Sequence, residues 1–455
     1  MLALSVSVYL LLTVFIGYLA SRKIKNASDF AVAGRKLPFL MSSAALFATW
    51  FGSETILGST EEFLKEGLIG VIEEPLGAAL CLIIVGLFYA RRMYRTNAIT
   101  FSDVFAERFG KKAEFMSAFV MIPSFFSWIA AQFIALAMLF QVLFGVSFIE
   151  GLLIGSVLVV VYTTLGGMWA VSVTDTIQTL VIILGLLFIL FLFLWETDIN
   201  KVIQSTPKGY FHLIDTNRVT WIEWFGAWCT VGLGSIASQD IFQRVVSSKS
   251  EKVAMYSAVS SGILYLVIGI VPLLIVLIGR FLYPTFYHHN QGNFISALIM
   301  MKTPVFVQVI YFGALISALL STASGAILAP ATVLAENVIR RFYPNYDLLR
   351  IMRWSVVGIA LVSVFISLSN KSIFELAGLA SAFSLVSVFI PFTATLFYKG
   401  TTSSGVILAM IIGISGWSIA EFFNSEFPSF FIGMGCSIAG LMIGIFYDRT
   451  IKIQS

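Results

Sequence analysis

Apolar positions occur along this chain in long, nearly uninterrupted runs, not in the alternating or one-faced patterns of soluble domains. Counting the broken ones, thirteen runs are long enough to cross about 30 Å of hydrocarbon. They lie near residues 2–20, 40–59, 68–90, 115–142, 147–166, 173–195, 221–239, 253–283, 304–337, 354–369, 373–398, 403–423 and 429–447. We therefore predict an all-α polytopic membrane protein with 13 transmembrane helices and termini on opposite sides of the bilayer.

Composition supports this prediction. Of the 455 residues, 58% are hydrophobic and 11% are charged, and the mean hydropathy of +0.94 lies far above that of soluble domains. The basic residues lie in short loops between apolar runs, so nucleic acid is not an expected partner. The three cysteines fall at distant positions in apolar runs, which excludes a disulfide framework. Arg22 and further basic residues follow the first run, which indicates a retained span and not a cleaved signal.

The distribution of basic residues predicts the orientation. Of the 28 Lys and Arg residues, 21 fall in one set of alternating loops and 7, including Arg218, fall in the other set. Cytoplasmic loops carry the excess of positive charge in membrane proteins. We therefore place the N-terminus outside and the C-terminus inside.

The run at 46–59 differs from the others because it places a carboxylate, Glu54, between Gly52 and Gly58 at membrane depth. In lipid every backbone N–H and C=O must bond within the protein. A glycine-interrupted helix that also carries a charge is therefore costly unless it lines a site. We predict a broken helix here that forms a binding site.

Two further segments carry carboxylates at similar depth. Glu73 and Glu74 precede a proline early in the third span, where they face either the outer interface or a cavity. Asp175 lies just inside the sixth span on its cytoplasmic side, where it either bonds Ser172 and Thr174 or contributes to a site. The sequence pattern leaves both pairs of alternatives open.

The ninth span groups oxygen atoms on one helix face. Ala318, Ser321 and Thr322 have i, i+3, i+4 spacing, which places one carbonyl and two hydroxyls together. Several such oxygens can bind a hard monovalent cation, and a broken helix supplies further free carbonyls. Small residues also allow helices to pack closely in membranes, so a cation site and a packing role both fit.

Enzyme motifs are missing from the sequence. It contains no nucleophile elbow, phosphate-binding loop or HExxH pattern, so an enzyme is not expected. His212, His288 and His289 fall in two long loops on the predicted outer side. The adjacent pair has no Cys or carboxylate at ligand spacing, which favours a solvated loop over a metal site.

Five segments together resemble the sodium:solute symporter family. They are SDFAVAGRKLP at 28–38, the broken second span ending in ILGS, GGMWAVSVTDTIQ at 166–178, SQDIFQRVVSSKS at 238–250, and LLSTASGAILA in the ninth span. They occur in the family's order over essentially the whole chain. Members of the family carry solutes such as proline, pantothenate, sugars, sialic acid, iodide and choline, and they have thirteen spans with the N-terminus outside.

The resemblance implies a leucine-transporter-like core of two inverted five-helix repeats, here residues 40–195 and 221–398. Residues 1–39 would form an extra N-terminal helix and the first cytoplasmic loop. Residues 196–220 would form an outer loop between the repeats. Residues 399–455 would form two C-terminal helices and a short tail.

The resemblance also implies a sodium site between the first and eighth core helices. The positions that correspond to its three carbonyl and two hydroxyl ligands are Ala48, Phe51, Ala318, Ser321 and Thr322. Asp175 corresponds to an aspartate near the family's sodium path. Two further hydroxyls that hold a second sodium in some members correspond to Ser324 and Gly325, so one ligand is missing and a second sodium is not expected.

The solute is less clearly indicated than the ion. The segment around Glu54 resembles choline carriers, and Trp50 and Trp128 correspond to two residues of their aromatic cage, which binds quaternary ammonium by cation–π attraction. The other two cage positions are Ala79 and Ser238, which offer no aromatic face. Core packing remains an alternative for both tryptophans. The residues expected to bind solute are Trp50, Glu54, Glu74, Trp128 and Ser238.

We therefore predict a sodium-coupled symporter that imports a small organic solute, an amino acid such as proline or a small organic amine, by alternating access. One alternative is a proton-coupled carrier that uses Glu54 or Glu74. Another is a membrane sensor that kept the carrier fold. No signalling domain follows the last span, which argues against a sensor unless it acts through a separate partner.

The expected ligands are Na⁺ and the solute, and the expected surroundings are the lipid bilayer. No obligatory protein partner is implied. Short loops and low charge suit a bacterial inner (plasma) membrane.

Overall fold

The computed structural model describes residues 2–215, 219–289, 293–369, 371–423 and 427–454, so Arg218 lies outside the described residues. Within these ranges the secondary structure is helical, apart from one isolated bridge between Leu37 and Ser248. Ten helices there are long and apolar enough to cross a membrane, and α3 is a shorter apolar helix. The predicted all-α class is confirmed.

The α-helices are α1 (Leu2–Ser21), α2 (Ala27–Val32), α3 (Phe39–Trp50), α4 (Ser59–Glu66), α5 (Ala78–Ile84), α6 (Ala90–Arg95), α7 (Phe101–Phe109), α8 (Lys111–Ser124), α9 (Phe126–Phe144), α10 (Phe148–Trp195), α11 (Ile199–Gln204), α12 (Trp221–Gly234), α13 (Gln239–Ser247), α14 (Glu251–Leu282), α15 (Pro284–His289), α16 (Phe294–Lys302), α17 (Val305–Val333), α18 (Arg340–Phe342), α19 (Leu348–Ile366), α20 (Ile373–Ser384), α21 (Ile390–Phe397), α22 (Ser403–Phe422) and α23 (Ser429–Gln454). Short π-helical or 3₁₀ segments join several of them, including Glu54–Gly58, Ile72–Gly77 and Ser235–Ala237.

Helix α10 is two antiparallel limbs and not one rod. Gly167 has φ 46° and ψ −162°, which interrupts the helix. The hydroxyls of Tyr162 and Thr174 are hydrogen-bonded to each other. Twelve residues of straight helix would separate them by about 18 Å, so the chain must reverse between them. The two limbs correspond to the predicted runs 147–166 and 173–195.

The apolar stretch from Glu54 to Arg95 folds back in the same way. Gly67, at φ 74°, ends α4. Thr55 donates a hydrogen bond to Glu74 at 2.8 Å, although a straight helix would place these residues about 28 Å apart. The fold-back in α10 and the two short helices α3 and α12 account for the difference between ten apolar helices and thirteen predicted runs.

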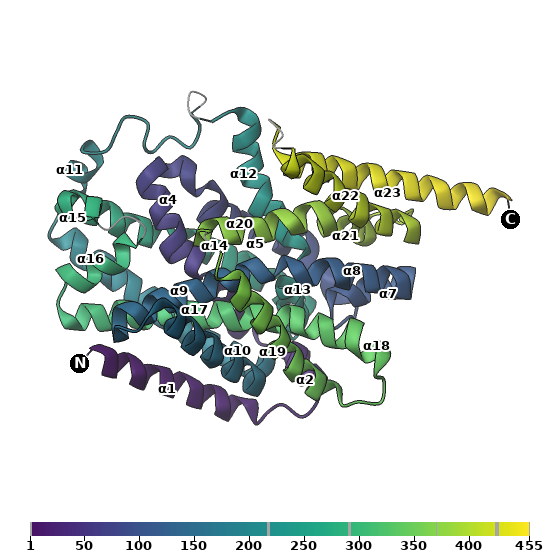
Figure 1. Ribbon diagram of the computed structural model, residues 1–455, viewed down its shortest axis with the longest axis horizontal. Coiled ribbons are helices and arrows are strands. Elements are labelled where there is room, and N and C mark those ends of the chain that lie inside the picture. The colour runs from purple at the N-terminus through teal and green to yellow at the C-terminus, as the bar shows by residue number, and fades with distance from the viewer. Residues whose placement is uncertain (1, 216–218, 290–292, 370, 424–426, 455) are drawn as a thin grey trace.

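Helix α17 lies at the centre of the molecule, where it packs against α3, α9, α10 and α19. Every residue from Tyr311 to Val333 is buried, as expected for a helix that is apolar on all sides. Figure 1 shows α17 running between α1 along one edge and the paired helices α22 and α23 along the other. A central helix of this kind contacts the elements that form the candidate site.

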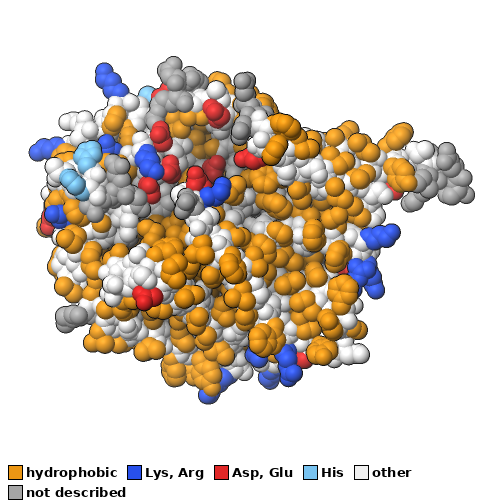
Figure 2. Space-filling view, in the orientation of Figure 1, with side chains coloured by type: hydrophobic (Ala, Val, Ile, Leu, Met, Phe, Trp, Pro, Cys, Tyr) orange, Lys and Arg blue, Asp and Glu red, His pale blue; other side chains and the backbone are white. Residues whose placement is uncertain are grey.

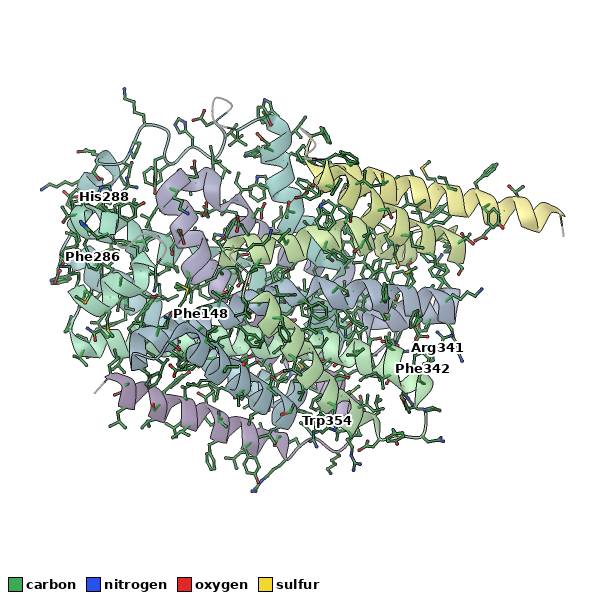
Figure 3. All side chains as sticks on the ribbon, viewed as in Figure 1. Phe148, Phe286, His288, Arg341, Phe342 and Trp354 are labelled. Atoms are coloured by element: carbon green, nitrogen blue, oxygen red, sulfur yellow. The ribbon has the colours of Figure 1, made fainter. Side chains whose placement is uncertain are left out.

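The ends of the bundle differ from its middle. Figure 1 places the N- and C-termini at opposite ends of the long axis. Figure 2 shows hydrophobic side chains covering most of the middle of the visible face, with Lys and Arg toward its ends. In Figure 3, His288 on α15 and Arg341 on α18 lie at opposite ends of the helices. An apolar band between charged ends is the surface expected of a protein that crosses a bilayer.

Candidate functional site

The first helix break lies at residues 51–53, between α3 and the π-helical segment Glu54–Gly58. In a continuing α-helix the N–H of Gly52 would bond the carbonyl of Ala48. Here it bonds the carbonyl of Trp50 instead, at 2.9 Å. The Ala48 carbonyl therefore lacks its helical partner, and it accepts a hydrogen bond from the Thr322 hydroxyl on α17 at 3.2 Å.

The positions corresponding to the sodium ligands are all buried and lie on the two elements that meet at this break. Ala48 and Phe51 come from the end of α3, and Ala318, Ser321 and Thr322 come from one face of α17. The direct contact between Ala48 and Thr322 brings the two groups together. Neutral carbonyl and hydroxyl oxygens of this kind can surround a monovalent cation.

Asp175 adjoins this group of oxygens. Its Oδ1 accepts a hydrogen bond from Ser321 at 2.6 Å, and its Oδ2 is buried with no hydrogen-bond partner among the described residues. The Thr174 hydroxyl donates to backbone carbonyls of its own helix, and the Ser172 hydroxyl has no hydrogen-bond partner among the described residues. Asp175 is therefore joined to α17 and does not make the local bonds to Ser172 and Thr174 that the sequence left open.

Gly52 is held too tightly for any side chain. A Cβ at this position would lie 2.7 Å from the Thr322 hydroxyl oxygen and 2.9 Å from Oε1 of Gln132 on α9. Both distances are shorter than real Cβ contacts. The break can approach α17 and α9 this closely only because residue 52 is a glycine.

A second break lies between α12 and α13, within the predicted apolar run 221–239. Helix α12 ends at Gly234, and Ser238 is extended, with φ −112° and ψ 141°. The chain then continues as α13, every residue of which is buried. Trp50 Nε1 donates to Asp240 Oδ2 at 2.6 Å, so the two breaks face each other.

A cavity lies between the two breaks. It is lined by Trp50, Glu54, Glu73, Glu74, Ser124, Phe125, Trp128, Val231, Ser235, Ser238, Asp240, Phe374, Ala377, Gly378, Ala380, Ser381 and Ser384. All five residues expected to bind solute are among them. Ala79, the other cage position, is buried elsewhere and does not line the cavity.

Neutral donors hold Glu54 and Glu74, two of the four cavity carboxylates, in place. Glu54, which is 5% exposed, accepts hydrogen bonds from Trp128 Nε1 at 3.0 Å and from Gln132 Nε2 at 2.7 Å. Glu74 accepts hydrogen bonds from the hydroxyls of Thr55 and Tyr265.

The other two carboxylates contrast with each other. Asp240 accepts hydrogen bonds from Trp50 and from the Ser238 hydroxyl. Glu73 receives none from the described residues, although it lines the cavity beside Gly378. Of the two alternatives for Glu73 and Glu74, the structure places both at a cavity. Figure 2 shows a group of acidic side chains on the upper part of the visible face.

Gln132 connects the cavity to the first break. Its Oε1 accepts a hydrogen bond from the Ser53 N–H at 3.0 Å, while its Nε2 donates to Glu54. The same Oε1 lies against Gly52, which in turn lies against Thr322. The side-chain amide of Gln132 therefore contacts two groups. One is the backbone at residues 52–53, next to the Thr322 hydroxyl, and the other is the Glu54 carboxylate, which lines the cavity.

Sequence reasoning missed Asp240, Gln132 and Tyr265. Each is a polar or ionisable side chain close to or within an apolar run, which is the criterion that identified Glu54. Applied to every run, it would have found them. His212, His288 and His289 lie away from the site, and the described residues contain no group of three metal-ligating side chains.

The chain is similar to known proteins over most of its length. The model of the sodium:solute symporter family matches residues 30–413. The human high affinity choline transporter 1 is 26% identical over 448 residues, covering 90% of this chain and 75% of that protein. The sodium/proline symporter of Haemophilus influenzae is 26% identical over 443 residues, covering 90% of this chain and 85% of that protein.

A solved structure shows the same fold. A Na⁺-coupled sialic acid symporter, in a substrate-bound outward-open state, superposes with a TM-score of 0.83. The match covers 98% of both chains at 17% sequence identity.

Proposed function

The chain belongs to the sodium:solute symporter family, and we propose that it imports a small organic solute together with Na⁺ by alternating access. The protein is an integral membrane transporter and not an enzyme, because the family consists of symporters. The observation that carries the proposal is the break at 51–53. On one side of this break lie carbonyl and hydroxyl oxygens that can bind a cation, and on the other side lies a cavity lined by carboxylates.

The proposed sodium ligands are Ala48, Phe51, Ala318, Ser321 and Thr322, with Asp175 on the path of the ion. Two observations support this assignment. The Ala48 carbonyl has lost its helical N–H partner, and one oxygen of Asp175 is buried without a donor. A cation would give the Asp175 oxygen, which has no partner among the described residues, a favourable contact, and it could replace the single Thr322 hydroxyl that now bonds the Ala48 carbonyl.

Gln132 supplies a route for coupling. Sodium at the proposed site would fix the backbone at Gly52 and Ser53, and Gln132 would transmit that order to Glu54. A ligand that stabilises the geometry another ligand needs increases the affinity for that second ligand, and the effect is reciprocal. We propose that sodium increases solute affinity in this way.

For the solute, the cavity favours a small organic amine over an amino acid such as proline. It presents carboxylates and two indole rings, both of which attract cations. Among the described residues, no Lys, Arg or His lines it to receive a solute carboxylate. An incomplete aromatic cage, with Ser238 in place of a ring, argues against choline itself.

The proposed topology has thirteen spans, an outside N-terminus and a cytoplasmic C-terminus. The proposed repeats are residues 40–195 and 221–398, each of which begins with a broken helix. Residues 1–39, 196–220 and 399–455 lie outside the repeats. The proposed location is a bacterial inner membrane.

Proton coupling is the second candidate. Glu74, Tyr265 and Thr55 form a triangle of close oxygens, in which either hydroxyl can donate to the Glu74 carboxylate or to the other hydroxyl, 2.5 Å away. Such a chain of hydroxyls beside a buried carboxylate can move a proton. In this candidate function, the proton would drive solute import in place of sodium.

The experiment is uptake into proteoliposomes with an inward Na⁺ gradient, an inward proton gradient or neither. Labelled proline, choline and a primary alkylamine are tested separately. The Thr322→Ala variant should lose Na⁺-dependent uptake, because it removes the hydroxyl that bonds the Ala48 carbonyl. Thr164→Ala is the matched control, since Thr164 bonds only carbonyls of its own helix. Uptake driven by protons and unchanged in Thr322→Ala would contradict sodium coupling.

A further inference from the structure

The charge of the solute cavity is unusual. Four of the seventeen lining residues are acidic, and none is basic. The acidic side chains come from three separate elements: the first break supplies Glu54, the π-helical segment Ile72–Gly77 supplies Glu73 and Glu74, and α13 supplies Asp240. The charge therefore surrounds the cavity from more than one side and is not confined to one helix end.

Among the described residues no Lys, Arg or His lines the cavity wall, although the guanidinium of Arg244 attracts the Asp240 carboxylate from behind the wall. The donors to Glu54, Glu74 and Asp240 are indole, amide and hydroxyl groups, all of which are neutral. Arg244 is buried behind Asp240, where it donates to the backbone carbonyls of Asp240 and Ala45 at 3.1 Å. Several carboxylates in one low-dielectric cavity repel one another unless protons or a counter-charge neutralise some of them.

The rest of the cavity wall is apolar or weakly polar. Phe125, Val231, Phe374 and small residues lie among the carboxylates. The indoles of Trp50 and Trp128 are anchored at their N–H groups to Asp240 and Glu54 respectively. The wall thus offers apolar surface for a hydrocarbon segment, and acceptors for charged ends that carry N–H groups.

We propose that the solute is an organic dication, an alkyl diamine or short polyamine with a methylene chain between two ammonium groups. This inference rests on the proposed function, and it specifies the substrate of the same cavity. Glu73 is the acceptor for one of the two ammonium groups, because it lines the cavity and receives no hydrogen bond from the described residues. The carboxylates near the tryptophans receive the other.

Other small solutes fit this wall less well. A zwitterionic amino acid brings a carboxylate into a cavity that already holds four. A quaternary ammonium has no N–H to donate, so it would leave the carboxylates without charge-assisted hydrogen bonds. A monoamine can satisfy only one side of the cavity.

The test measures binding to the purified full-length protein in detergent, with and without Na⁺, by calorimetry. The probes are 1,4-diaminobutane, butylamine, choline and proline. The diamine should bind about tenfold or more tightly than butylamine, as expected for one additional charge-assisted hydrogen bond. Labelled 1,4-diaminobutane should also enter proteoliposomes under a Na⁺ gradient.

Glu73→Gln should remove most of the preference for the diamine over butylamine. Because no described residue donates to Glu73, the variant should fold and still show Na⁺-dependent thermal stabilisation. Glu62→Gln is the control, since Glu62 lies on α4 and pairs with Lys65 away from the cavity. Its preference should stay unchanged.

The outcomes separate the two proposals. Na⁺-driven uptake of proline or choline, with equal binding of diamine and butylamine, would overturn the dication and leave the symporter intact. Diamine binding without any effect of Na⁺ on binding or uptake would overturn sodium coupling and leave the dication intact. An unchanged diamine preference in Glu73→Gln would remove Glu73 from the site.

Discussion

The two sides of the first helix break present different chemical groups. On the side of α17, the groups are the Ala48 carbonyl and the Ser321 and Thr322 hydroxyls, with a single carboxylate, Asp175, behind them. On the cavity side there are four carboxylates and two indoles. A small ion is selected by close neutral oxygens in a fixed geometry. A larger organic cation needs charge and apolar surface.

The largest effect should come from removing the glycine that lies between the two sides. Gly52→Ala would place a Cβ against both Thr322 and Gln132, at distances that require the break to move. We expect uptake to fall to background and Na⁺-dependent stabilisation to disappear. Gly313→Ala, on α17 with no atom within 4 Å of its Cβ position, should transport normally. Normal Na⁺ stabilisation in Gly52→Ala would show that the break tolerates a side chain.

A smaller and more selective effect on transport is expected from a variant that removes the connection between the proposed sodium site and the cavity but leaves both sites intact. Gln132→Leu removes the hydrogen bonds to Ser53 and Glu54 while keeping a side chain of similar size. Na⁺ and solute should each still bind. The ratio of the solute Kd without Na⁺ to the solute Kd with Na⁺ is roughly 5 to 150 in typical coupled systems, and in this variant it should fall toward one.

Calorimetry at fixed Na⁺ concentrations measures this ratio. Gln141→Leu, at the end of α9 in a position outside the cavity lining, is the control. A ratio that stays at the wild-type value in Gln132→Leu would place the coupling elsewhere.

The smallest effect is expected from a substitution in the wall of the cavity. Trp50→Phe keeps an aromatic face but removes the N–H that bonds Asp240. Solute affinity should fall by a factor of about 2 to 12, which corresponds to the loss of one hydrogen bond. The Na⁺ concentration that gives half-maximal thermal stabilisation in the absence of solute should not change. A shift in that concentration would mean that residues other than Gln132 also connect the cavity to the proposed sodium site.

The first break could be found from sequence because its signals are local. Glu54 between two glycines inside an apolar run violates the pattern of a lipid-facing helix, whatever surrounds it. The second break also has local signals that were overlooked, because Gly232 and Gly234 lie in the run from 221 to 239 and Asp240 follows it directly. The significance of Asp240 depends on Trp50, which lies 190 positions away.

The sequence by itself indicated the helical class, through the length and composition of each apolar run, and the family, through five motifs in the family's order. Only the tertiary structure decided which of the buried polar groups meet. It joined Asp175 to Ser321 and not to its own helix, and it placed Gln132 between Thr322 and Glu54. It also turned Glu73 and Glu74 toward a cavity. The physical reason is that a buried polar group takes partners from neighbouring helices, and the packing of distant segments sets which helices are neighbours.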